Sequence, residues 1–238
     1  MAQQIVPVRV EDGYRIQSEV HRLLTPGLGP WVGYKIGCTS QVMQKYLAIP
    51  HPCAGGVPAR GVHPSGVVLN ASDYVRVGVE CEIAVRLGKD LVPAGAPFTS
   101  DSVADGIESY LPAIEIVDDR YVKWETLGAP TLIADDLFAA GIVLGQPVAR
   151  AAVPDLLDVQ GRTLVNGRET GRGTGADVLG HPHNALAWLA NHLASQGTAL
   201  RAGEIVMTGS LVKTEWLEAG AQATMEFSGL GNVQVTFV

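Results

Sequence analysis

Residues 75–87 read VRVGVECEIAVRL and alternate between apolar and other side chains almost without exception. This alternation is typical of a β-strand with one buried face. Side chains two positions apart on a strand share a face, so Glu80 and Glu82 project into one space about 7 Å apart. An acidic pair of this kind is more often a plain solvated face than a site. Evidence for a site must therefore come from the rest of the chain.

Length, charge and composition exclude several classes of protein. The 238 residues are 47% hydrophobic, enough for a sizeable core, and the net charge is −7 without a cluster of Lys or Arg. We therefore expect no partnership with nucleic acid or with a membrane surface. The first residues lack the pattern of a signal peptide and no segment has the apolar length of a membrane span, so we expect a cytoplasmic protein. Cys38, Cys53 and Cys81 lack C-x-x-C spacing and are expected to be reduced thiols.

Hydrophobic spacing and turn residues predict the other elements. A helix is predicted over residues 11–24, ending at Pro26 and Gly27, and further helices over 40–47, 102–110 and 182–193. Asn166-Gly167 is typical of a tight hairpin turn. A strand is predicted over 203–209 and a closing hairpin over 223–237. Residues 49–66 are so rich in Pro and Gly that they predict a loop.

Two ionisable residues lie on short predicted strands. Lys35 in WVGYKIGCTS, residues 31–40, is flanked by Gly33 and Gly37, which would let another segment or a ligand approach its ammonium group. The alternative is a surface lysine on an edge strand. Glu115 in LPAIEIV, residues 111–117, lies on a strand of otherwise apolar residues. A carboxylate there needs a partner, which would be either Arg120 or a metal ion.

Seven blocks of the sequence occur in the order found in a known family. They are GYKIGCTS, VECEIAVRLGKDL, AIEIVDDRYVKW, IADDLFAAGIVLG, GHPHNALAWLANHL, GEIVMTGS and GLGNVQV. Together they resemble the 2-keto-4-pentenoate hydratase and 4-oxalocrotonate decarboxylase branch of the fumarylacetoacetate hydrolase superfamily. The resemblance implies an α+β fold, a mixed β-sandwich roll with peripheral helices. It implies a single domain over 1–238, with a helical N-terminal segment over 1–30 packed on it.

The resemblance also implies a metal site and an active-site lysine. It implies that a divalent cation, Mg²⁺ or Mn²⁺, is bound by Glu80, Glu82 and Glu115. It makes Lys35 the catalytic lysine, and it assigns the wall of the substrate pocket to Thr208, Gly209 and Ser210. The residue chemistry agrees, because three carboxylates without a cation would repel one another and a hard dication prefers oxygen ligands.

The activity implied is that of a metal-dependent hydro-lyase. Its substrate would be a small 2-oxo or 2-hydroxydienoic acid, such as 2-keto-4-pentenoate, from the catabolism of aromatic compounds. The alternatives are a 4-oxalocrotonate-type decarboxylase, an acylpyruvate C–C hydrolase that uses His51 or His63, and a non-catalytic partner subunit. The protein is expected to form a homo-oligomer, or a complex with a decarboxylase or hydratase of the same pathway.

One segment departs from the family pattern. Relatives carry a proline, then often an aspartate that serves as an acid or base, then an aromatic residue. Here Cys53 takes the place of the acid and Ala54 that of the aromatic residue. We predict that Cys53 lies in the pocket as a catalytic residue and that the loop over 51–57 determines the reaction. The alternative is a packed, inert thiol.

Overall fold

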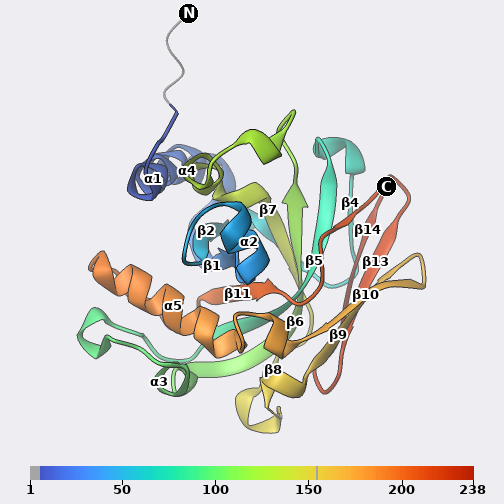
Figure 1. The fold of residues 1–238 in the computed structure, drawn as a ribbon. Coiled ribbons are helices and arrows are strands. Elements are labelled where there is room, and N and C mark those ends of the chain that lie inside the picture. The colour runs from blue at the N-terminus through green and yellow to red at the C-terminus, as the bar shows by residue number, and fades with distance from the viewer. Residues whose placement is uncertain (1–5, 154) are drawn as a thin grey trace, which may run out of the picture.

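Two mixed β-sheets with helices around them form the computed structural model, which describes residues 6–153 and 155–238 (Figure 1). The larger sheet contains β1 (Trp31–Gly37), β2 (Cys53–Pro58), β3 (Val62–Pro64), β5 (Val77–Leu87), β6 (Ile107–Asp118), β7 (Ala139–Leu144), β8 (Val148–Ala149), β11 (Ile205–Ser210) and β12 (Glu215–Trp216). Its strands are ordered β2-β1-β11-β5-β6-β7-β3, with β12 beside β5 and β8 beside β6. The predicted strand over 75–87 is thus a central strand of this sheet.

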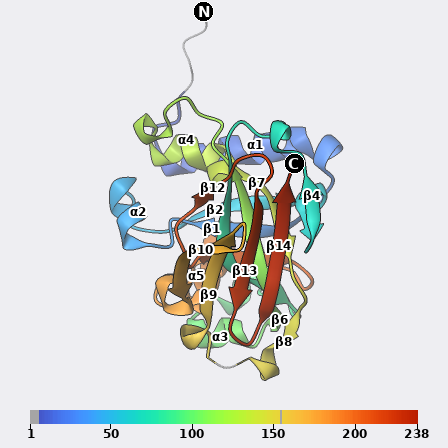
Figure 2. The same ribbon diagram turned by 90° about the vertical axis from the view of Figure 1, so that its right-hand side faces the viewer.

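The smaller sheet covers one face of the larger one. It contains β4 (Val67–Leu69), β9 (Gln160–Val165), β10 (Arg168–Thr174), β13 (Gln222–Phe227) and β14 (Gly231–Phe237), in the order β10-β9-β13-β14-β4 (Figure 2). The apolar face of β5, with Cys81 and Ile83, shares a core with Met225 and Val235 of this sheet. The apolar parity of residues 75–87 therefore points into the space between the sheets. The other face of β5 carries Glu80 and Glu82 away from that core.

Five α-helices are described. They are α1 (Val10–Leu28), α2 (Gln41–Tyr46), α3 (Ser100–Ala104), α4 (Ala129–Ala134) and α5 (Pro182–Ser195). Helices α1 and α4 lie side by side over β2, on the side of the larger sheet away from the smaller one (Figure 1). The buried amide of Gln17 fixes α1, donating to the carbonyl oxygens of Ala54 (2.9 Å) and Ile133 (2.8 Å). None of the described helices is long and apolar enough to cross a membrane.

Three predicted boundaries were wrong. Helix α1 runs past Pro26 to Leu28 and ends at Gly29, whose φ of +80° suits glycine at a helix end. The helix predicted over 102–110 is only α3, because Gly106 interrupts it and β6 begins at Ile107. The loop predicted over 49–66 contains strands β2 and β3, since its prolines fall at strand ends and its glycines allow close packing.

Other predictions are confirmed. Asn166 and Gly167 join β9 to β10 with φ values of +51° and +77°, as a two-residue hairpin requires. The predicted helix over 182–193 is α5, and the predicted closing hairpin is the β13–β14 pair. The α+β class with mixed sheets and peripheral helices is likewise confirmed.

A glycine substitution tests the close approach of β1 to β11. A Cβ atom on Gly33 would overlap the backbone oxygen of Ile205, so Gly33→Ala is expected to lower the free energy of unfolding by at least about 2 kcal/mol. The control is Gly27→Ala in α1, where a Cβ meets nothing within 4 Å; it should leave stability unchanged or raise it by about 0.5–1 kcal/mol. Urea unfolding followed by circular dichroism measures both, and equal stabilities would contradict this account of the strand packing.

Candidate functional site

Three carboxylates converge because of strand register. Glu80 of β5 lies directly opposite Glu115 of β6, and Glu82 shares the face of Glu80. One carboxylate oxygen from each lies within 4.8 Å of the others. Glu82 and Glu115 are each only 1% exposed. The structure therefore brings the three predicted metal ligands together, with Glu82 and Glu115 buried and Glu80 partly buried.

The ammonium group of Lys35 lies against this cluster. Its Nζ is 2.9 Å from Glu115 Oε1 and donates to the carbonyl oxygen of Leu137 at 3.2 Å. Burial alone would lower the pKa of Lys35, but the carboxylates of Glu115, Glu80 and Glu82 together outweigh it and the pKa is raised. Arg120 instead pairs with Asp135 at 2.7 Å. The surface-lysine alternative for Lys35 and the Glu115–Arg120 pair are therefore both wrong.

The three carboxylates of the cluster carry more negative charge than the single ammonium group of Lys35 can balance. Burial, followed by the charges of Glu115 and Glu80, raises the pKa of Glu82 well above its ordinary value. Burial also raises the pKa of Glu115 to about 7, against the opposing effect of Lys35. Glu80 Oε1 accepts a hydrogen bond from Thr214, but Glu82 Oε1 has no hydrogen-bond partner among the described residues. A buried carboxylate oxygen without a partner is the feature a cation would satisfy.

The predicted pocket-wall residues support the cluster from β11. The backbone N–H of Gly209 donates to Glu82 Oε2 at 2.9 Å, and Thr208 Oγ1 donates to the carbonyl oxygen of Ile83 at 2.7 Å. Ser210 lies opposite Glu82 in the β11–β5 pair. These three residues do not belong to the cavity wall defined by the described residues. Their contact with substrate stays a prediction.

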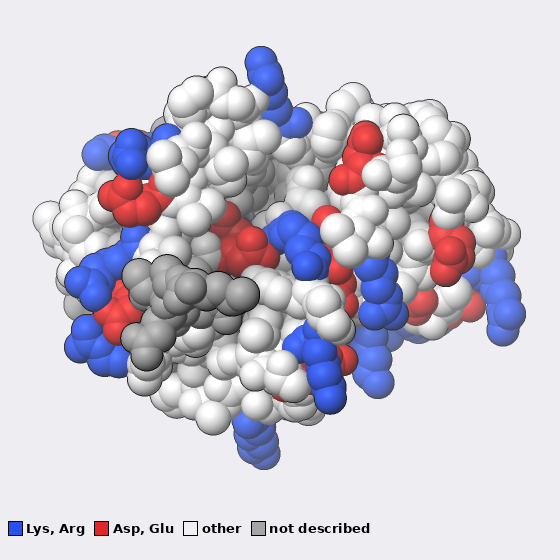
Figure 3. Space-filling view, turned by 90° about the horizontal axis from the view of Figure 1, so that it is seen from above, with Lys and Arg blue, Asp and Glu red and all other residues white. Residues whose placement is uncertain are grey.

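A cavity of about 420 Å³ opens beside Lys35 and Glu115. Helix α1, strands β2 and β7 and the segment before β7 supply most of its wall. Its ionisable lining residues are Lys35, Arg60, His63, Glu115, Arg120, Asp135 and Asp136, and apolar residues such as Val20, Leu24, Leu28, Val57 and Ile142 supply the rest. Because its lining is both charged and apolar, the cavity suits a small, partly apolar molecule with a charged end. On the molecular surface seen in Figure 3, acidic and basic side chains are interspersed without a broad basic patch.

Cys53 lies on strand β2 and is fully buried. It belongs to an apolar cluster with Leu132, Ile133 and Leu137, and it is not among the residues that line the cavity. Contact with the Cys38 thiol, together with burial, raises its pKa, which makes it a poor base. These contacts support the inert-thiol alternative. A catalytic function of Cys53 stays an untested prediction.

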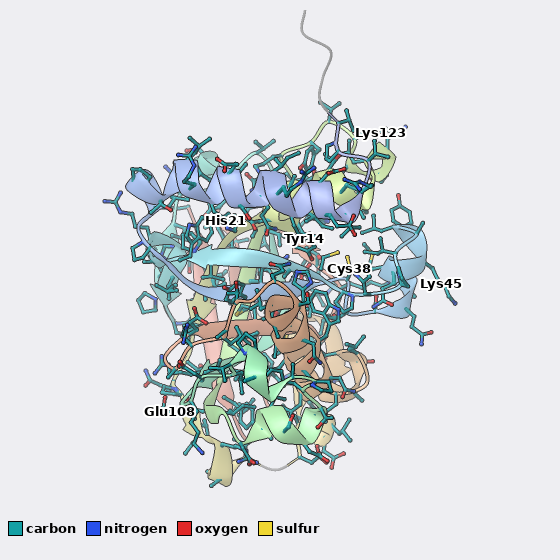
Figure 4. All side chains as sticks on the ribbon, turned by 90° about the vertical axis from the view of Figure 1, so that its left-hand side faces the viewer. Tyr14, His21, Cys38, Lys45, Glu108 and Lys123 are labelled. Carbon is teal, nitrogen blue, oxygen red and sulfur yellow. The ribbon has the colours of Figure 1, made fainter. Side chains whose placement is uncertain are left out.

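The histidines are placed differently from one another. His63 lines the cavity, with its pKa lowered by burial, whereas His51 stacks on Trp188 outside it. Sequence reasoning missed His21, whose Nε2 lies 2.7 Å and 2.9 Å from the two carboxylate oxygens of Asp136. His21 points from α1 toward the strands beneath it (Figure 4). No spacing signal links positions 21 and 136, which meet only because α1 packs over β2.

Comparison with known proteins agrees with the fold. The model of the fumarylacetoacetate (FAA) hydrolase C-terminal family matches residues 57–238. The 2-hydroxyhexa-2,4-dienoate hydratase of Comamonas testosteroni is 34% identical over 96% of this chain and 86% of its own length, and the 2-keto-4-pentenoate hydratase of Paraburkholderia phymatum is 36% identical over 94% and 84%. A structure of the 4-oxalocrotonate decarboxylase from Pseudomonas putida G7, complexed with magnesium and adipate, superposes with a TM-score of 0.92 at 28% identity over 97% of this chain and 87% of that one. The chain belongs to the fumarylacetoacetate hydrolase family, close to its 2-keto-4-pentenoate hydratases and 4-oxalocrotonate decarboxylases.

Proposed function

We propose that this chain is a divalent-metal-dependent hydro-lyase that hydrates a small 2-hydroxydienoic or 2-oxo acid of the 2-keto-4-pentenoate kind. The observation that carries the proposal is the Lys35 ammonium group held 2.9 Å from one of three converging carboxylates at the wall of a cavity. Relatives at 34–36% identity over nearly the whole chain are hydratases of such acids. The cavity has room for a substrate of this size.

Glu80, Glu82 and Glu115 would hold the cation. The donor set fits Mg²⁺ or Mn²⁺, since it consists of carboxylate oxygens only and includes Glu82 Oε1, which no described residue hydrogen-bonds. When bound, such an ion would supply Lewis-acid stabilisation of negative charge on the 2-oxo oxygen. The Gly209 N–H would keep Glu82 oriented toward the site.

Lys35 would move the proton during tautomerisation. Lys35 is 4% exposed, and its ammonium group is held from two sides, by Glu115 and by the carbonyl oxygen of Leu137. A positioned ammonium can donate a proton to the dienol of the substrate or take one from the keto form through its amine. Because Lys35 also lines the cavity, it would reach the reacting carbon without rearrangement of the fold.

A decarboxylase is the second candidate. The solved structure with a TM-score of 0.92 is a 4-oxalocrotonate decarboxylase, and a site that stabilises an enolate serves both reactions. The products separate the two candidates. The protein is incubated with 2-hydroxypenta-2,4-dienoate and, separately, with 4-oxalocrotonate, and both the dienoate absorbance and the released CO₂ are measured. Consumption of 2-hydroxypenta-2,4-dienoate without release of CO₂ supports hydration. Consumption of only 4-oxalocrotonate, with CO₂ release, would replace this proposal.

The metal site predicts the effect of Glu82→Gln. The amide removes a negative ligand, so Mn²⁺ affinity should fall at least about tenfold. Isothermal titration calorimetry measures it, and circular dichroism checks that the fold is kept. The control is Glu108→Gln, an exposed residue on the same strand as Glu115 that lies far from His21 in Figure 4. Equal affinities for Glu82→Gln and wild type would show that Glu82 is not a ligand.

Proton competition predicts a pH dependence of metal binding. Only deprotonated carboxylates bind the ion, and the pKa is about 7 for Glu115 and raised well above its ordinary value for Glu82. Binding must therefore displace protons at neutral pH, and affinity falls as the solution becomes more acidic. Between about pH 8 and about pH 6, Mn²⁺ affinity should drop at least about tenfold. A constant affinity over this range would mean that the metal binds elsewhere.

The proposed proton transfer is tested by Lys35→Met, which keeps most of the side chain's length and removes the ammonium group. Turnover should fall at least about a hundredfold, because the proton carrier is lost, while oxalate binding to the metal-loaded protein stays within about threefold. The control is Lys45→Met on α2, where the lysine is exposed and lies apart from His21 in Figure 4. Normal turnover by Lys35→Met would remove this lysine from the mechanism.

A further inference from the structure

We infer that Asp136 is a second catalytic group of this site and that His21 positions it, so that the pair activates the water that is added to the substrate. The inference rests on the proposed hydration. Asp136 lines the same cavity as Lys35 and Glu115. Its side chain is 12% exposed, enough to meet a small molecule in the cavity and little enough to be held firmly. Neither residue is used by the metal site or by the Lys35 proton transfer.

The carboxylate of Asp136 is fixed from two directions. Its Oδ1 accepts a hydrogen bond from the backbone N–H of Gly56 at 2.9 Å, and both oxygens face His21 Nε2. Trp31 stacks on the imidazole with ring centroids 3.7 Å apart, and Trp31 Nε1 donates to Thr25 Oγ1. A base whose orientation is fixed by a histidine and a backbone amide is pre-organised for proton transfer. His21 is not part of the cavity wall, so it acts through Asp136.

The backbone around Asp136 supports a functional assignment. Asp136, Leu137 and Phe138 have φ values of +54°, +49° and +68°, a run of three residues in the left-handed region. Each such residue costs roughly 1–2 kcal/mol, and strain of this kind concentrates at functional sites. Here it directs the Asp136 carboxylate toward Gly56 and the carbonyl oxygen of Leu137 toward Lys35. One strained turn therefore positions both proposed proton carriers.

Glycines in strand β2 leave space for the side chains of Asp136 and His21. A Cβ on Gly55 would lie 3.0 Å from Lys35 Cδ and 3.1 Å from Asp136 Oδ1, and a Cβ on Gly56 would lie 2.6 Å from His21 Cε1. The Asp136 carboxylate reaches the site from the turn before β7, and the two glycines of β2 leave room for it and for His21.

The chemical step balances without another reactant. The Asp136 carboxylate takes one proton from water, the water oxygen bonds to the distal alkene carbon, and the π electrons move through the conjugated system to the 2-oxo oxygen as an enolate. The enolate then returns to the ketone and takes up a proton at carbon 3 from the Lys35 ammonium group. Asp136 releases the proton that it took from water to the solvent, and the Lys35 amine takes one up from the solvent, so both residues regain their starting states. The product has gained one oxygen and two hydrogens, the atoms of one water molecule.

The test is Asp136→Asn, which keeps the shape, the tolerance of positive φ and the contact with His21 while removing the base. In the Mg²⁺-loaded protein, kcat for hydration of 2-hydroxypenta-2,4-dienoate should fall about 10²- to 10⁴-fold with KM changed less than about threefold. Exchange of solvent deuterium into pyruvate, which needs enolisation but no added water, should stay within about threefold. His21→Phe keeps the stack on Trp31 and should lower kcat by a smaller factor, and the double variant should be no slower than Asp136→Asn alone.

The matched control is Asp155→Asn, which alters a second His–Asp pair, His181 with Asp155 at 3.3 Å, outside the cavity. Its hydration rate should equal wild type. Thermal unfolding checks that each variant is folded, and Mn²⁺ titration checks that it binds the metal ion. If Asp136→Asn is unstable, Asp136→Gly replaces it, because glycine also suits a φ of +54°. Unchanged hydration by the variant, or an equal loss of hydration and exchange, would overturn the assignment of Asp136. Neither hydration nor exchange in the wild type would instead overturn the proposed function and this inference with it.

Discussion

The pairing of Glu80 with Glu115 across two central strands is the constraint around which the site is arranged. It places like charges side by side, Glu115 buried and Glu80 partly buried, so that repulsion and lost hydration both act against folding. Four strands that are consecutive in the larger sheet, β1, β11, β5 and β6, then contribute to the cluster: Lys35, the Gly209 N–H, Glu80 with Glu82, and Glu115. The order of the strands in the sheet therefore brings these charged and polar groups together, in addition to forming the core.

The formal charges show why the lysine alone is insufficient. Three carboxylates and one ammonium group leave two negative charges, which is the charge that one divalent cation balances. Without an ion, the protein compensates by holding protons, as the raised pKa values of Glu82 and Glu115 show. The same burial that makes the cluster costly in the metal-free protein strengthens its attraction for a dication. Local instability and metal affinity thus have a common cause.

The sequence predicted what depends on strand periodicity and little of what depends on contact between distant elements. The alternation over 75–87 identified the shared face of Glu80 and Glu82, and the apolar surroundings of Glu115 marked it as needing a partner. Periodicity failed over 49–66, where strand β2 exists because its glycines fit beneath α1 and not because of its propensity. It also could not place Asp136 against His21, 115 positions away, since that contact depends on how α1 packs.

The segment from Asp136 to Phe138 joins the two halves of the site at a cost in stability. Three left-handed residues together cost roughly 3–6 kcal/mol, a large part of the 5–15 kcal/mol by which a domain is usually stable. The fold offsets this locally, because Phe138 packs edge-on against Tyr121 and Trp124 while Leu137 enters the apolar cluster that contains Cys53. The apolar surroundings of Cys53 therefore matter to the site even if the thiol does no chemistry. They anchor the turn whose backbone holds Lys35 and whose side chain pairs with His21.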